Sequence, residues 1–276
     1  MQKSNGGYGY DSTDMTALRY RLRDLKATKI VYITDFSQGN HFEMCFRAGR
    51  MAGWWNPTSS SVVHIGFGTV QGTDGKRFKT RSGETVRLVD LLDESVRRME
   101  GILVEREKEG KGSLAQSDIR STAEKIGYGA IKYFDLSRNP TSNYVFSYDS
   151  MLDTRGNTGV YLMFAYARVT SILSKGGDES AAAAGRDVSI THASERSLAF
   201  ELLRFGDVIK SASDGLSPAL ICEYLYGLSL TVTGFMTECR VLGSERTGSR
   251  LGFCKAAKEC MKVCFWLIGI DPPERI

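Results

Sequence analysis

The residues with the clearest chemical potential are basic and hydroxyl-rich, and they follow the apolar run Val62–Val70. Positions 74–85 read Asp-Gly-Lys-Arg-Phe-Lys-Thr-Arg-Ser-Gly-Glu-Thr, with four cations, three hydroxyl side chains and two glycines. Glycine lets the backbone come close to a ligand, and cations, hydroxyls and free N–H groups suit phosphate oxygens. The stretch is therefore a candidate phosphate-binding loop, and a solvated basic turn is the alternative that composition alone favours.

Residues 78–83, followed by 85–92, resemble the signature-loop region of arginyl-tRNA synthetases, a class I family. Class I synthetases normally carry a KMSKS loop here that grips the ATP phosphates. Many arginine enzymes carry a diverged version, and this sequence departs from KMSKS in the same way. The resemblance runs from about Ser4 to the C-terminus, and it implies that four loop residues stabilise the charge that builds up on the leaving pyrophosphate. These residues are Lys79, Thr80, Arg81 and Ser82.

The N-terminal segment offers a second candidate site. Residues 4–14 are glycine-rich and polar and predict a loop, and a helix follows from about Met15 to Leu25. Asp14 suits the N-cap of that helix. In the synthetase family pattern, a tyrosine and an aspartate four residues later contact the side chain of the substrate arginine, and Tyr10 and Asp14 match this spacing. A guanidinium has five donors and favours a carboxylate beside an aromatic ring, so both interpretations remain open.

A strand–helix–strand unit is expected to position these candidates. β-branched and aromatic residues predict strands at Lys29–Thr34 and Ser61–Phe67, with a helix from about Gly39 to Gly53 between them. Such a unit makes two parallel strands joined by a right-handed crossover. Ligands of open α/β sheets bind beyond the carboxyl ends of the strands. The segment Asp35–His41 and the basic loop both follow such ends, so the sequence predicts one shared site.

The segment after the first strand also resembles the synthetase family. Within residues 32–42, Gln38 matches a glutamine that contacts the substrate arginine, and His41 matches a histidine near ATP. A histidine at a helix start is more often a surface or capping residue, so the role of His41 depends on the resemblance. His64 is predicted to be a structural histidine. Residues 64–68 resemble the strand beside the adenine, where glycines let a base approach the backbone. The residues implied to contact ATP there are Gly66, Phe67 and Gly68.

The second half of the sequence is predicted to be helical. Residues 86–127 form a charged helical region with a solvated charge run at 105–111. Later helices are predicted at about 160–173, 194–212, 219–238 and 250–268. Residues 133–137 and 148–161 resemble the entry into the synthetases' anticodon-binding domain. The last helix turns small apolar residues inward and lysines outward, and the resemblance makes these lysines candidate tRNA phosphate contacts. They are Lys255, Lys258 and Lys262.

Composition is typical of soluble globular proteins. The 276 residues are 42% hydrophobic and 25% charged, with a formal net charge of +4, a mild bias that is compatible with a polyanionic partner. The six cysteines show no metal-binding spacing and no disulfide framework, so a reducing, cytoplasmic compartment and no bound metal are expected. The sequence has no apolar run of about 18 residues and no signal-peptide pattern, which predicts no membrane association.

The expected fold class is the α/β half of a Rossmann-type parallel sheet followed by an all-α helical-bundle anticodon-binding domain. Residues 1–127 are expected to be the C-terminal half of a class I catalytic domain with signature loop and connecting helices, and 128–276 the tRNA-binding domain. A class I synthetase also needs a HIGH-type motif, and none of the three histidines lies in a His-x-Gly-His sequence. We therefore expect a partial enzyme: a fragment, or a chain completed by a separate N-terminal half or a multi-synthetase assembly.

The function that the resemblance implies is arginine–tRNA ligation. ATP and L-arginine would form arginyl-adenylate with release of pyrophosphate, and the arginine would then be esterified to the 3′ end of its tRNA. ATP is expected as a substrate with Mg2+ as counter-ion, without a prosthetic group, and the protein is expected to be a monomer. The alternative is a non-catalytic tRNA-binding or scaffolding remnant of such a synthetase. An unrelated α/β nucleotide-binding protein would require the matches at Tyr10–Asp14 and 78–83 to be coincidences.

Overall fold

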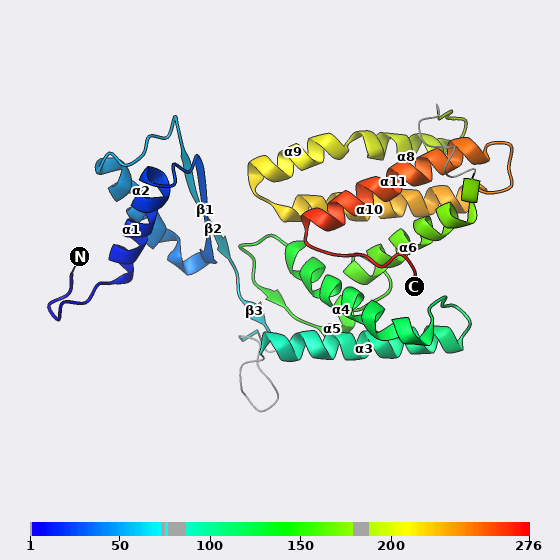
Figure 1. The fold of residues 1–276 in the computed structure, drawn as a ribbon, viewed down its shortest axis with the longest axis horizontal. Helices are drawn as coiled ribbons and strands as arrows, with labels where there is room; N and C mark the ends of the chain where they lie inside the picture. The colour runs from blue at the N-terminus through cyan, green and yellow to red at the C-terminus, as the bar shows by residue number, and fades with distance from the viewer. Residues whose placement is uncertain (1, 73–74, 77–86, 179–187) are drawn as a thin grey trace. The chain divides into compact units, whose positions relative to one another are not determined.

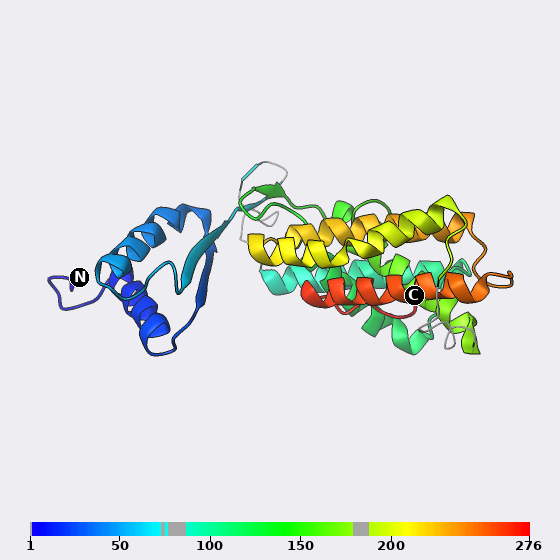
Figure 2. The same cartoon turned by 90° about the horizontal axis from the view of Figure 1, so that it is seen from above.

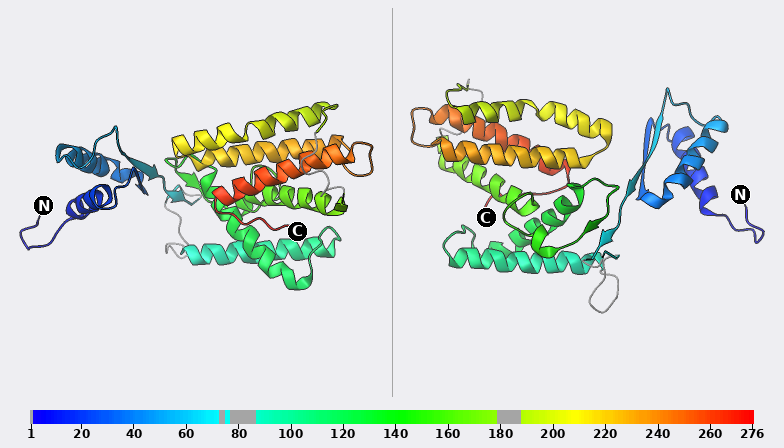
Figure 3. Two further views of the ribbon diagram at one scale, coloured as in Figure 1. Left: turned by 45° about the horizontal axis from the view of Figure 1, so that its top comes forward. Right: turned by 180° about the vertical axis from the view of Figure 1, so that it is seen from behind.

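The computed structural model describes residues 2–72, 75–76, 87–178 and 188–276, and the chain divides into two compact units (Figure 1). Unit 1 comprises Met1–Arg77 together with Pro140–Val145, and unit 2 comprises the remaining residues. The described residues are mostly helical, with small parallel sheets, as Figures 2 and 3 show from other sides. Parallel strands with a helical second half are therefore confirmed, and the Rossmann-type completion of the sheet stays a prediction.

Unit 1 contains two parallel strands joined by a helix. Strand β1 (Lys29–Asp35) pairs with β2 (Ser61–Phe67) along its whole length, and they are connected by the short 3-10 helix η1 (Phe36–Gln38) and helix α2 (Gly39–Met51). Parallel neighbours need a crossover connection, because a tight turn cannot return the chain to the same end of the sheet. The predicted strand–helix–strand unit is thus confirmed.

Helix α1 (Tyr10–Arg23) begins earlier than the sequence predicts. Its N-cap is Gly9, which makes no side-chain capping bond, so the prediction of a loop as far as residue 14 is wrong. The interpretation of Asp14 as the N-cap is wrong for the same reason. The polar residues here are loop formers by composition, but Asp11 in the first turn suits the positive end of the helix dipole.

The core of unit 1 lies between the helices and one face of the β1–β2 sheet. Its buried members are Leu18, Leu22, Ile30, Tyr32, Phe42 and Val62. Helices α1 and α2 approach closely at Gly49, where an added Cβ would stand 2.9 Å from Leu18 Cδ2. Side chains alternate between the faces of a strand, and Ile33 on the other face of β1 is 65% exposed. That face is therefore uncovered by the described residues.

Unit 2 is a helical bundle. Helix α10 lies against α6, α8, α9 and α11, while α4 packs against α3 and α6. The bounds are α3 (Leu88–Lys108), α4 (Ile119–Leu136), α5 (Tyr148–Met151), α6 (Gly159–Lys175), α8 (Ala193–Leu203), α9 (Phe205–Gly215), α10 (Pro218–Glu238) and α11 (Thr247–Leu267). The buried face of α11 includes Cys254, Ala257 and Met261, as the sequence predicts.

Two predicted helical stretches are each divided in the structure. Residues 86–127 contain α3 and the start of α4, and the charge run 105–111 ends α3 in exposed ion pairs such as Lys111–Glu109. The predicted helix 194–212 becomes α8 and α9, which meet at Arg204. The division expected after residue 127 falls inside α4, and as a boundary between catalytic and tRNA-binding parts it stays a prediction.

Helix α10 is long and apolar enough to cross a membrane, with a mean hydropathy of 1.3 in its most apolar window. Among the described helices it alone meets this test. Its neighbours α6, α8, α9 and α11 bury Leu225, Leu228 and Val232 completely. A core helix of a bundle has the same composition, because it is apolar on several sides at once.

A buried carboxylate joins α8 to α11. Glu195 is fully buried, and its side chain accepts hydrogen bonds from the backbone N–H groups of Thr191 at 2.8 Å and His192 at 3.1 Å. Arg250 Nε donates to the other carboxylate oxygen at 2.9 Å. Burial by itself raises the pKa of Glu195, but these donors and the charge of Arg246 outweigh it and hold the pKa at about 2.

We expect Glu195→Gln to lower the free energy of unfolding of the chain by about 3 kcal/mol at neutral pH, because a buried ion pair loses one partner. The pKa is lowered on folding, so this stabilisation is present above pH 4.5 and is lost as the pH falls towards 2. Urea unfolding between pH 7 and pH 3, read by circular dichroism, measures it. The wild type should lose stability over this range more steeply than the variant, and parallel curves would contradict the assignment.

Candidate functional site

Two of the predicted site residues, Asp14 and His41, join α1 to the start of α2. Tyr10 and Asp14 lie one turn apart on α1, and residues at this spacing share one face of a helix. His41, in the first turn of α2, donates from Nε2 to Asp14 Oδ2 at 2.7 Å. Both side chains of this pair are partly exposed, whereas Tyr10 is 88% exposed. The other carboxylate oxygen of Asp14, Oδ1, has no hydrogen bond within the described part of the chain.

The turn after β1 fixes where α2 begins. The side chain of Asp35 accepts hydrogen bonds from the N–H group of Ser37 at 2.9 Å and from its hydroxyl at 2.6 Å. Gln38 follows at the N-cap of α2, exposed and without a side-chain capping bond. Phe42 is buried in the core and therefore anchors the turn that carries His41. The short connection thus places Gln38 and His41 directly after the carboxyl end of β1.

His64 has the structural role that the sequence predicts. Its Nε2 lies 2.8 Å from Thr34 Oγ1 on the neighbouring strand, and its ring stacks on Phe42 with centroids 5.1 Å apart. Cys45 lies one helical turn after His41 on α2, and its side chain is buried. Burial first, and then the charges of Asp14 and Asp11, raise the pKa of its thiol. A thiol with a raised pKa is a poor nucleophile, so neither side chain is a candidate for chemistry.

The glycines at the end of β2 make room for protein backbone. An added Cβ at Gly66 would stand 2.7 Å from Phe36 Cα, and one at Gly68 would stand 2.5 Å from the carbonyl oxygen of Ser142. The N–H group of Gly68 donates to the carbonyl of Pro140 at 2.7 Å. This close approach precedes the parallel pair of β3 (Val70–Gln71) and β4 (Tyr144–Val145). Both glycines therefore have a packing role, and their contact with ATP stays a prediction.

The remaining predicted residues fall into two groups. Lys79, Thr80, Arg81 and Ser82 lie outside the described residues. Of the three α11 lysines, Lys262 is exposed and Lys255 half-buried. Lys258 is also half-buried, and its ammonium lies 3.3 Å from Glu274 Oε1 and 5.6 Å from the centre of the Tyr166 ring.

The sequence analysis missed a basic cavity of about 570 Å3 in unit 2. It lies between the end of α3, the outer side of α6 and the last residues of the chain. Its cationic lining residues are Arg106, Lys111, Arg168, Lys175 and Arg275, against one carboxylate side chain, Glu274. The guanidinium of Arg106 stands 4.5 Å from the centre of the Phe164 ring, and its buried Nε has no hydrogen-bond partner among the described residues. The cavity therefore concentrates positive charge, and one of its cations lies over an aromatic ring.

Two protein-family models match the chain. The family model described as "tRNA synthetases class I (R), catalytic domain" matches residues 1–148. The model for the DALR anticodon binding domain matches residues 162–276.

The chain belongs to the class I arginyl-tRNA synthetase family.

Relatives with this name match almost the whole chain. The chloroplastic/mitochondrial arginine–tRNA ligase of Arabidopsis thaliana is 47% identical over 99% of this chain and 43% of its own length. The cytoplasmic arginine–tRNA ligase of Arabidopsis thaliana is 46% identical over 99% of this chain and 47% of its own length. The arginyl-tRNA synthetase structure from Plasmodium falciparum superposes with a TM-score of 0.84 at 35% identity, covering 100% of this chain and 46% of that one. The chain thus spans about half the length of the relatives it matches.

The lysines predicted to contact tRNA and the residues of the basic cavity are different sets. The three lysines lie on one helix, α11, and such a pattern is also typical of a solvated helix face. The basic cavity combines α3, α6 and the C-terminal segment. Arg168 and Lys175 lie seven residues apart on α6, which is the one local signal that pointed to it. Arg106 and Arg275 join them only through the packing of the bundle.

Proposed function

We propose that this chain is the C-terminal part of an arginine–tRNA ligase. In the complete enzyme, ATP and L-arginine form arginyl-adenylate with release of pyrophosphate, and the arginyl group is then esterified to the 3′ end of the tRNA. The observation that carries the proposal is the hydrogen bond between Asp14 on α1 and His41 at the start of α2, after the carboxyl end of β1.

The arginine side chain is bound by α1 in this proposal. Asp14 keeps one oxygen, Oδ1, available for the guanidinium while His41 holds the other. The bond from His41 fixes the carboxylate before the substrate arrives, which reduces the entropy lost on binding. Tyr10, one turn away and exposed, can pack against the planar guanidinium. Gln38 supplies an amide at the start of α2 for a further hydrogen bond.

ATP is bound across the carboxyl ends of β1 and β2 in this proposal. Phe67, at the end of β2, is 45% exposed and presents an aromatic face to the adenine. The loop residues Lys79, Thr80, Arg81 and Ser82 hold the phosphates by the family resemblance. Negative charge grows on the pyrophosphate as the bond to it breaks, so donors placed there lower the barrier. ATP is a substrate with Mg2+ as counter-ion.

The tRNA is bound by unit 2 in this proposal. The basic cavity beside α6 concentrates cations, which suit RNA phosphates. It also contains a guanidinium that lies over the Phe164 ring, and arginine guanidinium planes are surfaces on which unstacked bases stack. Lys262 adds an exposed cation on α11, and half-buried Lys255 is a weaker candidate. Lys258 contributes less, because its ammonium is engaged by Glu274.

Unit 1 requires a further part to become a complete catalytic domain. Parallel sheets are covered on both faces in folded proteins, yet the face of β1 that carries Ile33 is uncovered by the described residues. The relatives are about twice as long as this chain. We infer that a further part of the enzyme covers this face and supplies the HIGH-type motif, either on the same polypeptide or as a separate N-terminal half or multi-synthetase assembly. The compartment stays a prediction of cytoplasm, because the two Arabidopsis relatives are named for different compartments.

We expect the purified chain alone to show no arginine-dependent ATP–pyrophosphate exchange, because the HIGH half of the site is absent from the sequence. Adding the N-terminal half of the chloroplastic/mitochondrial Arabidopsis relative should restore exchange. Robust exchange by the chain alone would contradict the first expectation. Failure of the added half, with tRNA binding intact, would favour the alternative function, a non-catalytic tRNA-binding remnant.

In the complemented enzyme, Asp14→Ala should raise the KM for arginine about 10- to 100-fold and leave the KM for ATP unchanged, because the guanidinium loses its charged partner. The matched control is Asp11→Ala, which removes a carboxylate of the same helix turn. Steady-state exchange kinetics with each substrate varied measure both constants. An unchanged arginine KM in the Asp14 variant, or an equal rise in the Asp11 variant, would remove Asp14 from the site.

Arg168→Ala should weaken tRNA binding by the chain about 5- to 10-fold at physiological salt and reduce the slope of affinity against salt, because one phosphate contact is lost. Lys258→Ala is the matched control on α11 and should change the affinity less. Fluorescence anisotropy with labelled tRNA at several salt concentrations measures both. A larger loss of tRNA affinity for Lys258→Ala than for Arg168→Ala would contradict this prediction and would place the tRNA interface on α11.

A further inference from the structure

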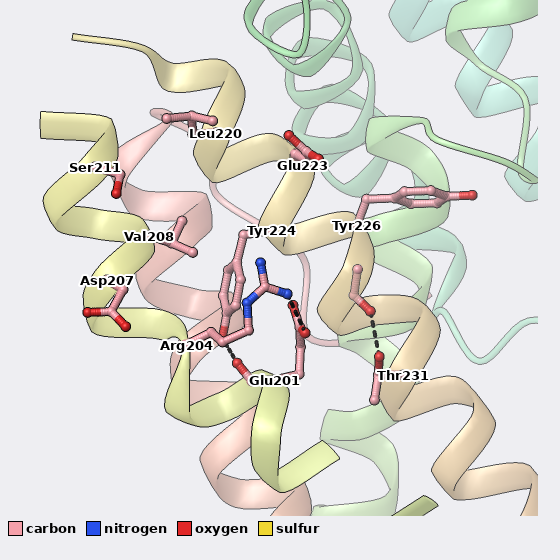
Figure 4. Close-up of a pocket in the computed structure, with 11 residues that line it drawn as sticks. Glu201, Arg204, Asp207, Val208, Ser211, Leu220, Glu223, Tyr224, Tyr226 and Thr231 are labelled. Atoms are coloured by element: carbon pink, nitrogen blue, oxygen red, sulfur yellow. Dashed lines mark hydrogen bonds and ion pairs between the residues drawn. The ribbon is translucent and has the colours of Figure 1, made fainter. Parts of the chain in front are cut away.

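A second cavity in unit 2 lies on a different set of helices and plays no part in the proposed ligation. It is a groove of about 580 Å3 between α10 on one side and α9 with the end of α8 on the other. Figure 4 shows Asp207, Val208 and Ser211 on α9, facing the helix that carries Leu220 and Tyr224. The groove is not an enclosed cavity, so a segment of a protein partner can reach it.

The groove contains an apolar strip. Val208 lines it from α9 and Leu220 lines it from α10, and both side chains reach the surface. Tyr224 also lines the groove but is only 4% exposed, and its hydroxyl donates to the carbonyl of Glu201 at 2.9 Å. Helix α9 is itself only half covered, since Ala212 is the single buried residue along it.

Negative charge lies on both walls of this strip. Asp207 on α9 and Glu223 on α10 are exposed, and neither has an ion pair with another described residue. Glu201 is already engaged by Arg204 at 3.0 Å. By contrast, Asp214 on the same helix α9 is paired with Lys210 at 2.6 Å. The groove is therefore acidic, opposite in sign to the cavity beside α6, and an acidic surface repels the RNA backbone.

We propose that this groove docks a basic amphipathic helix of a protein partner. The apolar side of the helix packs on Val208 and Leu220, and lysine or arginine side chains pair with Asp207 and Glu223. An amphipathic helix in a groove is a recurrent mode of recognition, and complementary charge at the rim selects the partner and speeds its association. The inference goes beyond the ligase function, because it assigns this face of unit 2 to protein rather than to RNA.

The test is a binding titration with a defined probe. The probe is a fluorescein-labelled peptide of about 18 residues, with leucines at helical spacing on one face and lysines on the other. A scrambled peptide of the same composition serves as control. Fluorescence anisotropy at physiological salt is measured on the full chain, on Asp207→Asn/Glu223→Gln, on Leu220→Ser, and on Glu245→Gln/Glu259→Gln. The last variant removes two exposed carboxylates outside the groove.

Saturable binding of the amphipathic peptide is expected, weakened about tenfold by Asp207→Asn/Glu223→Gln and several-fold by Leu220→Ser. The Glu245→Gln/Glu259→Gln variant should bind as the wild type does. Circular dichroism of each variant must match the wild type, which the exposed positions of these residues favour. Absence of binding, equal affinity for the scrambled peptide, or equal losses in the groove and control variants would overturn the proposal. Loss of tRNA binding in the groove variants would place RNA here and overturn it too.

Discussion

The parallel pairing of β1 with β2 is the constraint on which the candidate active site depends. Parallel neighbours require a crossover, so α2 must start at the carboxyl end of β1 and lie on the sheet. The core residues Tyr32, Phe42 and Leu18 then hold α1 against α2. Only in this packing can His41 reach Asp14 at 2.7 Å. The same pairing leaves one face of the sheet uncovered by the described residues. The chain spans only about half the length of its relatives, and a further part of the enzyme is proposed to cover this face.

Unit 2 separates charge in space. Its buried carboxylate, Glu195, is fully neutralised by backbone donors and Arg250, as a charge removed from water must be. Its surface charge is sorted into a basic cavity beside α6 and an acidic groove between α9 and α10. This division of charge is the physical basis of the two proposals, a polyanion at the basic cavity and a cationic partner at the acidic groove. The mild net charge of the whole chain conceals this division.

Three glycines in unit 1 lie where another part of the chain comes close to the backbone. Gly66 and Gly68 were expected to make room for a nucleotide base. In the structure the space beside them is filled by Phe36 and by the backbone of Ser142. Gly49 likewise lets α1 and α2 approach each other. A glycine marks a close approach of backbone to something, and only the fold shows whether that is a ligand or the chain itself.

The sequence by itself determined the strands, the crossover helix, the buried face of α11 and the structural role of His64, because periodicity and residue type act over short distances. It also placed Tyr10, Asp14, Gln38 and His41 among the candidates. It missed the start of α1 at Tyr10 and the break at Arg204, since polar residues near a helix end suit loops and first turns equally. The hydrogen bond between Asp14 and His41, the pairing of Lys258 with Glu274, and the meeting of Arg106 with Arg275 were decided only by tertiary structure. Each joins residues far apart in the chain, and packing alone sets such distances.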